Sequence, residues 1–189
     1  MKDGFLKAAA LSPALRVADC AYNVRQITEA LRKAAARGVK LAVFPEFCLT
    51  GYTCGDLFLQ RTLQTGALDA LSTLLDETKA LDVVTLVGLP LLVHGKLYNC
   101  AAVLCHGRIL GLVPKTYLPN YGEFYEKRQF TPGSTEVELV EVCGQQVPFG
   151  TSCCSAAARC PALCWVWRSA RICGAPCRLP PSTRWPVRP

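Results

Sequence analysis

The sequence predicts an α/β domain in which helices pack on a β-sheet, and three features of the chain support this fold class. Two short, almost wholly apolar runs, 39–44 and 83–88, have the length and composition of strands buried in a sheet. Each run follows a longer segment in which apolar residues recur at helical spacing. From residue 97 onwards, apolar runs alternate with tight-turn sequences, which is typical of β-hairpins. The order strand, helix, strand, helix, strand and then hairpins therefore favours layers of helices on a sheet.

The individual elements follow from local patterns. Helices are predicted over 23–37 and 63–78, and strands over 5–10, 39–44, 83–88, 97–104, 109–113, 136–142 and 145–148. In the first helix Val24, Ile27 and Leu31 form an apolar stripe. Asn23 is its expected N-cap, and Gly38 follows its last turn. The strand over 39–44 is so apolar that we expect it to be buried on both faces.

The charge of the chain changes near Thr151. The net charge is +7, from 21 Lys and Arg against 14 Asp and Glu. All 14 acidic residues and 15 of the 21 basic ones lie before residue 153, so this part is nearly neutral. The six remaining basic residues are arginines of the tail 153–189, which has no Asp, Glu or Lys. Because the excess charge belongs to the tail, we expect no nucleic-acid-binding face on the domain.

The sequence indicates a soluble, cytoplasmic protein with no membrane contact. The longest apolar run, 83–93, is interrupted by Gly88 and Pro90 and is shorter than the about 20 residues that span a bilayer. Asp3 and Lys7 do not fit a signal peptide. Six of the 12 cysteines lie before residue 153, among apolar residues and without close spacing. This pattern is typical of reduced core thiols.

The tail has an unusual composition. It contains the other six cysteines, all three tryptophans and six of the 13 prolines. Cys160 with Cys164, and Cys173 with Cys177, form two pairs whose spacing can place four thiolates on a zinc ion. A small protein with a zinc-binding or nucleic-acid-binding tail is therefore one interpretation of the chain.

Two charged residues come shortly after predicted strands. Glu46 follows the 39–44 strand, and Lys115 follows the 109–113 strand. Ligands of α/β sheets bind at the carboxyl ends of strands, where a Glu can act as a general base and a Lys can stabilise an oxyanion. The same positions would also suit structural roles, in which Glu46 caps a backbone amide and Lys115 is a solvated loop residue. Glu46 and Lys115 are therefore candidates for a catalytic role, with the structural roles as alternatives.

The segment 117–130 combines aromatic and charged side chains. Aromatic residues interleaved with Lys and Arg can bind single-stranded nucleic acid, but Glu123 and Glu126 oppose this. A loop that lines a small-molecule pocket is the better interpretation of this segment.

Five short motifs are more informative than any single residue. They are Phe44-Pro45-Glu46, Leu49-Thr50-Gly51-Tyr52, Gly88-Leu89-Pro90, Tyr98-Asn99-Cys100-Ala101 and the run from Val113 to Tyr121. Together they resemble the nitrilase superfamily of carbon-nitrogen hydrolases. The particular resemblance is to the N-terminal glutaminase domain of bacterial glutamine-dependent NAD synthetases. It runs without a gap from Met1 to about Gly150 and includes 122–128.

The resemblance implies a nitrilase-like α-β-β-α sandwich, here incomplete because the C-terminal part is missing, and a Glu–Lys–Cys triad. Glu46 matches the general base, and Lys115 matches the lysine on the oxyanion side. Glu126 matches the second carboxylate near that lysine. In such an enzyme a cysteine thiolate attacks the amide carbonyl of L-glutamine, a thioester forms and ammonia leaves.

The resemblance also implies binding residues and partners. Tyr52, Tyr121 and Phe124 match positions around the glutamine pocket, and enzymes of this kind form homo-oligomers. Their ammonia passes to a synthetase domain that acts on deamido-NAD. ATP, Mg²⁺ and deamido-NAD belong to that domain, so we expect neither a cofactor nor a metal in this chain.

The chain departs from the family after about residue 151. The family's nucleophilic cysteine lies in a segment like GVEICEDLW, and this string is absent. Permitted codons for 163–174 spell VLGVEICEDLW when they are read two bases later, and 180–188 allows SEHALAGA in the same way. We therefore expect a reading-frame shift near Thr151–Ser152, in the gene or in its sequencing. Residues 1–151 would be the N-terminal part of a glutaminase domain, and 152–189 an out-of-frame tail.

This interpretation predicts that the chain as written lacks glutaminase activity. The codon of the lost nucleophile would straddle Ser169 and Ala170, so Cys173 is not that cysteine. Glu46 and Lys115 would then have no thiolate to serve. A different amidase of the same superfamily is the alternative, which the motif over 117–128 disfavours.

Overall fold

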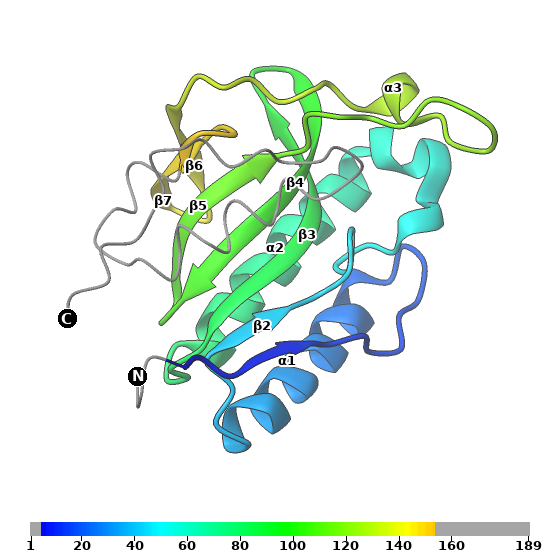
Figure 1. Cartoon of the computed structure of the whole chain (residues 1–189). Coiled ribbons are helices and arrows are strands. Elements are labelled where there is room, and N and C mark those ends of the chain that lie inside the picture. Colours follow the sequence, from blue (N-terminus) through cyan, green and yellow to red (C-terminus); the bar gives the residue numbers. More distant parts are fainter. Residues whose placement is uncertain (1–4, 154–189) are drawn as a thin grey trace.

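The architecture is a seven-stranded mixed sheet with two long helices (Figure 1). The structure, a computed structural model, describes residues 5–153. Within these residues the elements are β1 (Ala8–Ala10), α1 (Cys20–Ala36), β2 (Leu41–Val43), the 3-10 helix η1 (Tyr52–Leu59), α2 (Arg61–Thr78), β3 (Val84–Val93), β4 (Lys96–Cys105), β5 (Arg108–Pro114), α3 (Glu126–Gln129), β6 (Glu138–Val142) and β7 (Gln145–Phe149). The predicted α/β class is confirmed.

The sheet is parallel at one edge and antiparallel in the middle. Its strand order is β1-β2-β3-β4-β5-β7-β6. β1, β2 and β3 run parallel, whereas β3 with β4 and β4 with β5 form antiparallel pairs. β7 pairs in parallel with β5 and antiparallel with β6. Because the chain reverses twice between β3 and β5, β5 points in the same direction as β2. The carboxyl ends of β2 and β5 therefore face the same edge of the sheet.

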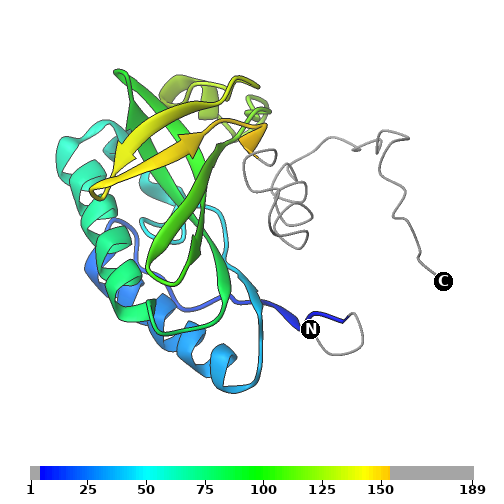
Figure 2. The same cartoon turned by 90° about the vertical axis from the view of Figure 1, so that its left-hand side faces the viewer.

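Both long helices lie on one side of the sheet (Figure 2). Val24, Ile27 and Leu31 of α1 pack into the main core together with Leu71 and Leu74 of α2. Each of these five side chains is at most 4% exposed. Burial of a large aliphatic side chain stabilises the fold by about 1.5–3 kcal/mol, so these stripes hold the helices on the sheet.

The start of α1 differs from the prediction. Asp19, not Asn23, is the N-cap, because the Tyr22 N–H donates to Asp19 Oδ1 at 2.9 Å. Asn23 is buried inside the helix, and its side chain donates to the carbonyls of Arg16 and Leu49. It also accepts from the Arg16 N–H. Asn23 thus connects α1 to the loop that follows β2, which is a tertiary role rather than a capping role.

β2 and β3 also differ from the prediction. β2 has only three residues, and Val43 is 39% exposed, so the expected burial on both faces is wrong at this position. β3 continues past Pro90 to Val93, because nine residue pairs, Thr85–Leu104 to Val93–Lys96, join it to β4.

The opposite face of the sheet carries a second, smaller apolar cluster. Leu86 of β3, Val103 of β4 and Val113 of β5 are buried there together with Cys153. A sheet that is apolar on both faces is typical of a layered α/β protein. The described residues therefore form one sheet and one helical layer of the predicted sandwich.

Most of the described cysteines lie in the core. Cys20, Cys48, Cys54, Cys100 and Cys153 are buried, and Cys105 and Cys143 are half-buried. The expectation of free core thiols is confirmed for Cys20, Cys48, Cys54 and Cys100. The pairs Cys160/Cys164 and Cys173/Cys177 lie outside the described residues. Over residues 5–153, no helix has both the length and the apolar character needed to cross a membrane.

Candidate active site

Glu46 and Lys115 meet although they follow strands that are not neighbours. β3 and β4 separate β2 from β5, which places these strands roughly 14 Å apart at the usual strand spacing. Lys115 Nζ nevertheless lies 2.9 Å from Glu46 Oε1. The contact forms because both residues leave the same edge of the sheet and their side chains converge over β3 and β4.

Gly88 of β3 allows the loop after β2 to cross the sheet. A Cβ atom at this position would lie 2.4 Å from Phe47 N and 3.0 Å from Glu46 Cα. Both neighbours are backbone atoms, so a side chain here would displace the loop. The Leu49 N–H also donates to the Gly88 carbonyl at 3.3 Å. Gly88 therefore decides how closely Glu46 approaches β4 and β5.

Phe47, directly after Glu46, has a left-handed backbone conformation. Its φ is 51°, which is uncommon for a bulky residue and costs on the order of 1–3 kcal/mol. Its side chain is 1% exposed, and its ring lies 4.7 Å from that of Phe58 and 5.1 Å from that of Phe130. This aromatic cluster holds the backbone of Glu46 against η1 and α3.

Asn99 of β4 contacts both charged residues. Its side-chain N–H donates to Glu46 Oε1, the oxygen that also accepts from Lys115. Its backbone carbonyl accepts from the Lys115 N–H at 2.7 Å. Asn99 is only 4% exposed, so the arrangement is buried in the sheet.

Glu126 reaches Lys115 through a long excursion of the chain between β5 and β6. The excursion returns to its starting point, where the Gly133 N–H donates to the Lys115 carbonyl at 2.9 Å. Glu126 begins α3, and its Oε1 lies 2.9 Å from Lys115 Nζ. The Tyr52 O–H donates to the same oxygen at 2.9 Å. Glu126 Oε2 is buried and has no hydrogen-bond partner among the described residues, so it remains an acceptor for a ligand.

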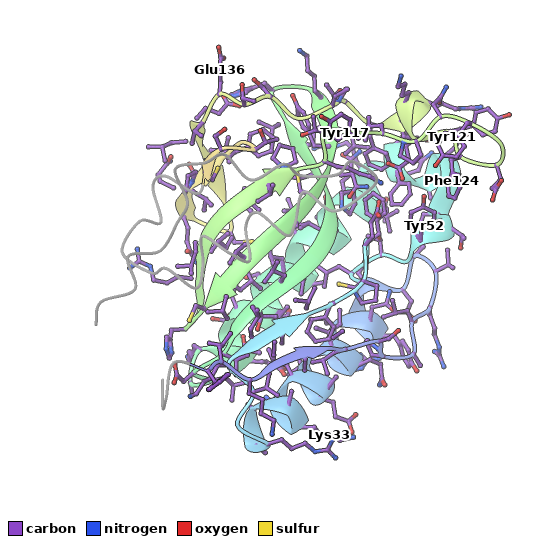
Figure 3. The ribbon with its side chains drawn as sticks, viewed as in Figure 1. Lys33, Tyr52, Tyr117, Tyr121, Phe124 and Glu136 are labelled. Atoms are coloured by element: carbon purple, nitrogen blue, oxygen red, sulfur yellow. The ribbon has the colours of Figure 1, made fainter. Side chains whose placement is uncertain are left out.

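A pocket of about 340 Å³ adjoins this cluster, which is the size of a small-molecule site. Its walls include Tyr52, Phe124 and Glu126, together with Asp56 and Arg128. An ion pair of 2.9 Å between Arg128 Nη2 and Asp56 Oδ2 joins η1 to α3. Figure 3 shows Tyr52 and Phe124 at the same end of the molecule, far from Lys33 in the last turn of α1.

The electrostatics of the site are those of one cation between two carboxylates. The Lys115 side chain is 14% exposed, and those of Glu46 and Glu126 are 29% and 7% exposed. Burial by itself would lower the pKa of Lys115. The hydrogen bonds and charges of Glu46 and Glu126 outweigh burial and hold that pKa above its usual value. Lys115 is therefore a firmly protonated donor, suited to stabilise a developing negative charge.

The buried cysteines do not have the character of a nucleophile. Burial raises the pKa of the thiol to about 12 in Cys48 and to about 11 in Cys20 and Cys153. It also raises the pKa of Cys54 and Cys100 above the usual value. A reactive cysteine needs a lowered pKa, because the thiolate is the nucleophile. The stretch 163–174, in which the lost nucleophile would be encoded, lies outside the described residues.

The structure brings together five of the six predicted site residues. The three predicted catalytic residues form one hydrogen-bonded cluster, and Tyr52 and Phe124 line the adjoining pocket. Tyr121 lies outside the pocket wall, is 72% exposed and packs its ring 5.8 Å from Phe124. Figure 3 shows Tyr121 beside Phe124 at the surface. The glutamine-binding role of these three residues stays a prediction.

Sequence reasoning did not single out Asn99 or Gly88 as parts of the site. Both belong to motifs on which the resemblance depends. A buried polar residue inside an apolar strand, and a glycine inside a long strand, were the available signals. Neither signal indicates that its residue contacts Glu46.

The fold and the site define an α/β protein with a lysine between two carboxylates beside a pocket of small-molecule size. The chain belongs to the carbon-nitrogen hydrolase family, whose model matches residues 7–164. This assignment confirms the superfamily that the motifs indicated.

Relatives of known name narrow the comparison. The chain is 40% identical over 158 residues to the glutamine-dependent NAD(+) synthetase of Mycobacterium tuberculosis. This aligned stretch covers 84% of this chain and 23% of that protein. It is 38% identical over 146 residues to the enzyme of the same name from Thermotoga maritima, covering 77% of this chain and 24% of that protein. The chain thus spans about a quarter of the length of these relatives.

Solved structures of an enzyme with this name and of an amidase share the fold of the described residues. A glutamine-dependent NAD(+) synthetase from Cytophaga hutchinsonii superposes with a TM-score of 0.72 at 28% identity, over 77% of this chain and 25% of that one. An amidase from Nesterenkonia sp. superposes with a TM-score of 0.58 at 22% identity, over 78% of this chain and 56% of that one. The second similarity shows the shared fold alone.

Proposed function

We propose that this chain is part of the glutamine-hydrolysing domain of a glutamine-dependent NAD synthetase, a cytoplasmic enzyme whose subunits form homo-oligomers. The observation that carries the proposal is the position of Lys115 Nζ, 2.9 Å from a carboxylate oxygen of Glu46 and 2.9 Å from one of Glu126. The names of the relatives support the choice of glutamine as substrate.

In the proposed reaction Glu46 is the general base. It takes the proton of a cysteine thiol, and the thiolate attacks the amide carbon of glutamine. Lys115 donates to the carbonyl oxygen as that oxygen becomes negative in the tetrahedral intermediate. The C–N bond then breaks, the nitrogen takes the proton held by Glu46 and ammonia leaves. Water hydrolyses the thioester, which releases glutamate and restores the thiol.

The pocket provides the surroundings of the substrate in this proposal. Tyr52 and Phe124 line the side of the glutamine chain, and Tyr121 packs against Phe124 outside the pocket wall. Glu126 Oε2 accepts from the amide N–H₂ group, because it is a buried acceptor without a partner among the described residues. The other oxygen of Glu126 is occupied by Lys115 and Tyr52.

We further propose that residues 1–151 are the N-terminal part of this domain and that 152–189 are out of frame. The chain as written then lacks the nucleophile and releases no ammonia. ATP, Mg²⁺ and deamido-NAD act in a separate synthetase domain. Residues 5–153 contain no group of three or more His, Cys, Asp or Glu side chains able to hold a metal ion.

Two measurements test the proposal. The coding DNA from codon 145 onwards should spell GVEICEDLW in the other frame and continue into a synthetase domain. Ammonia release from glutamine should then be absent in the chain as written and present in the chain with the frame restored after residue 151. In the restored chain Glu46→Gln and Lys115→Met should abolish release, whereas Lys33→Met on α1 should not change it.

Other outcomes would support the alternatives. A restored chain that hydrolyses simple aliphatic amides but not glutamine is another amidase of the family. DNA without the shifted string, together with zinc in the purified chain, would show that the tail is authentic and binds metal. Either result would overturn the proposed function.

A further inference from the structure

Glu46 reaches Lys115 from the end of a short strand. Its side chain follows a three-residue strand and crosses β3 before it reaches Lys115. The Glu46 side chain is 29% exposed, twice the 14% of Lys115, so packing alone restrains it less. A general base is effective only when its oxygen is held within hydrogen-bond reach of the proton it takes.

Asn99 contacts both Glu46 and Lys115. It lies on β4, which is the strand between β3 and β5. The loop of Glu46 passes over β3, and Lys115 directly follows β5. Its backbone carbonyl accepts from the Lys115 N–H, and its side chain donates to Glu46 Oε1. Its Cα is fixed by pairing with Pro90 in an unbroken stretch of the β3–β4 ladder. Asn99 therefore has a rigid base from which to hold the carboxylate.

We propose that Asn99 is the positioning residue for Glu46, holding its carboxylate against Lys115 for the general-base role. The inference rests on the proposed function for that role, but the contact itself does not depend on activity. Asn99 and Lys115 both donate to Oε1. Two hydrogen bonds to the same oxygen fix the orientation of the carboxylate more firmly than the bond from Lys115 does by itself.

The alternative is that Asn99 only donates a hydrogen bond to the Glu46 carboxylate and does not fix its position. The two roles predict opposite changes at Lys115. If Asn99 holds Glu46 in place, its loss lets the carboxylate move away, and the pKa of Lys115 falls toward its usual value. If Asn99 only shares the negative charge, its loss strengthens the attraction between Glu46 and Lys115, and the pKa of Lys115 rises.

The experiment is a pH titration of Lys115 in the chain as written, followed by the NMR shift of its labelled Cε carbon and assigned with Lys115→Arg. Glu46→Gln sets the scale, because it removes one of the two carboxylates. We expect it to lower the pKa of Lys115 by about one pH unit. Asn99→Leu should produce at least a third of that fall, with the fold checked by circular dichroism. Asn99→Ala serves if the leucine variant does not fold.

Thr85→Val is the matched control. Thr85 is a buried polar residue of β3, and its pairing partner on β4, Leu104, lies five residues further along the strand than Asn99. This variant should leave the titration of Lys115 unchanged. A smaller fall than a third, no change or a rise in the Asn99 variants would overturn the proposal. So would a Glu46→Gln variant without effect, because Glu46 would then not pair with Lys115. Ammonia release does not enter this test, so a failure of the proposed function is recognised separately.

Discussion

Replacing Lys115 by methionine tests whether the cluster of Glu46, Lys115 and Glu126 holds the fold together as well as forming a site. The substitution keeps most of the apolar stem of the side chain and removes the ammonium. Two carboxylates that share this cation would then face each other without it. We expect a large loss of stability, because desolvated carboxylates would be left uncompensated.

The magnitude follows from the burial of the partners. Removing one member of a buried ion pair costs about 3–5 kcal/mol. Glu126 is 7% exposed and fits this case, but Glu46 is 29% exposed and is partly screened by water. We therefore expect a loss of about 2–4 kcal/mol in the free energy of unfolding at pH 7. The matched control is Lys33→Met, which breaks an ion pair of 2.6 Å with Glu29. Those side chains are 69% and 58% exposed, so no measurable change is expected.

The assay is urea unfolding followed by circular dichroism, for both variants and the parent chain. The pKa of Lys115 is raised in the folded state, so its contribution is fully present below the unfolded-state pKa of about 10.4. It is lost as the pH rises through the folded-state value. The difference between Lys115→Met and the parent should thus be constant from pH 7 to pH 9 and shrink above about pH 10.4.

A loss below about 1 kcal/mol at pH 7 would refute this reasoning, because it would place Lys115 among the exposed ion pairs. A difference that does not change between pH 9 and pH 11 would refute the electrostatic cause in particular. A loss in Lys33→Met as large as that in Lys115→Met would show that distance, not burial, decides the strength of these pairs.

Three further predictions concern the backbone, the thiols and the first helix. Gly88→Ala should lower the free energy of unfolding by about 1–3 kcal/mol, because its Cβ would meet Phe47 N and Glu46 Cα. The control is Gly66→Ala in α2, whose Cβ would lie 3.6 Å from Cys20 Sγ and which should raise the free energy of unfolding by up to about 1 kcal/mol. If urea unfolding shows that both variants gain or both lose stability, one of these two predictions is wrong. Cys48, whose pKa is raised by burial to about 12 from 9.0, should carry about a thousand-fold less thiolate at pH 8. Alkylation followed by mass spectrometry should find Cys48 unmodified until urea unfolds the chain. Equal alkylation rates of Cys48 in the folded and the unfolded chain would contradict this prediction. Asp19→Ala should cost about 1 kcal/mol through loss of the N-cap of α1, and Asn23→Ala should cost more, because Asn23 also joins α1 to Leu49. The opposite order of the two variants in thermal unfolding would show that the hydrogen bonds of Asn23 to Arg16 and Leu49 stabilise the fold less than the N-cap does.

The sequence predicted the local elements well where one period dominated. The helices over 20–36 and 61–78 and the hairpin of β4 and β5 lie within a few residues of their predicted bounds, because their patterns are local and strong. The errors occurred where a contact outside the element itself decided its bounds or the role of a residue. Asn23 is a helix residue held by Leu49, and β3 extends past Pro90 because β4 pairs with it.

The candidate site shows the same division. By itself the sequence determined the residue types, the family and the positions of Glu46 and Lys115 after apolar strands. Only the tertiary structure decided that β2 and β5 point the same way, because this depends on two reversals of chain direction between them. The contributions of Gly88 and Asn99 depend on a loop that crosses β3 and brings the Glu46 side chain to β4, which no local pattern records. Contacts between residues far apart in the chain, such as the 2.9 Å pair of Glu46 and Lys115, follow from the sheet and not from spacing in the sequence.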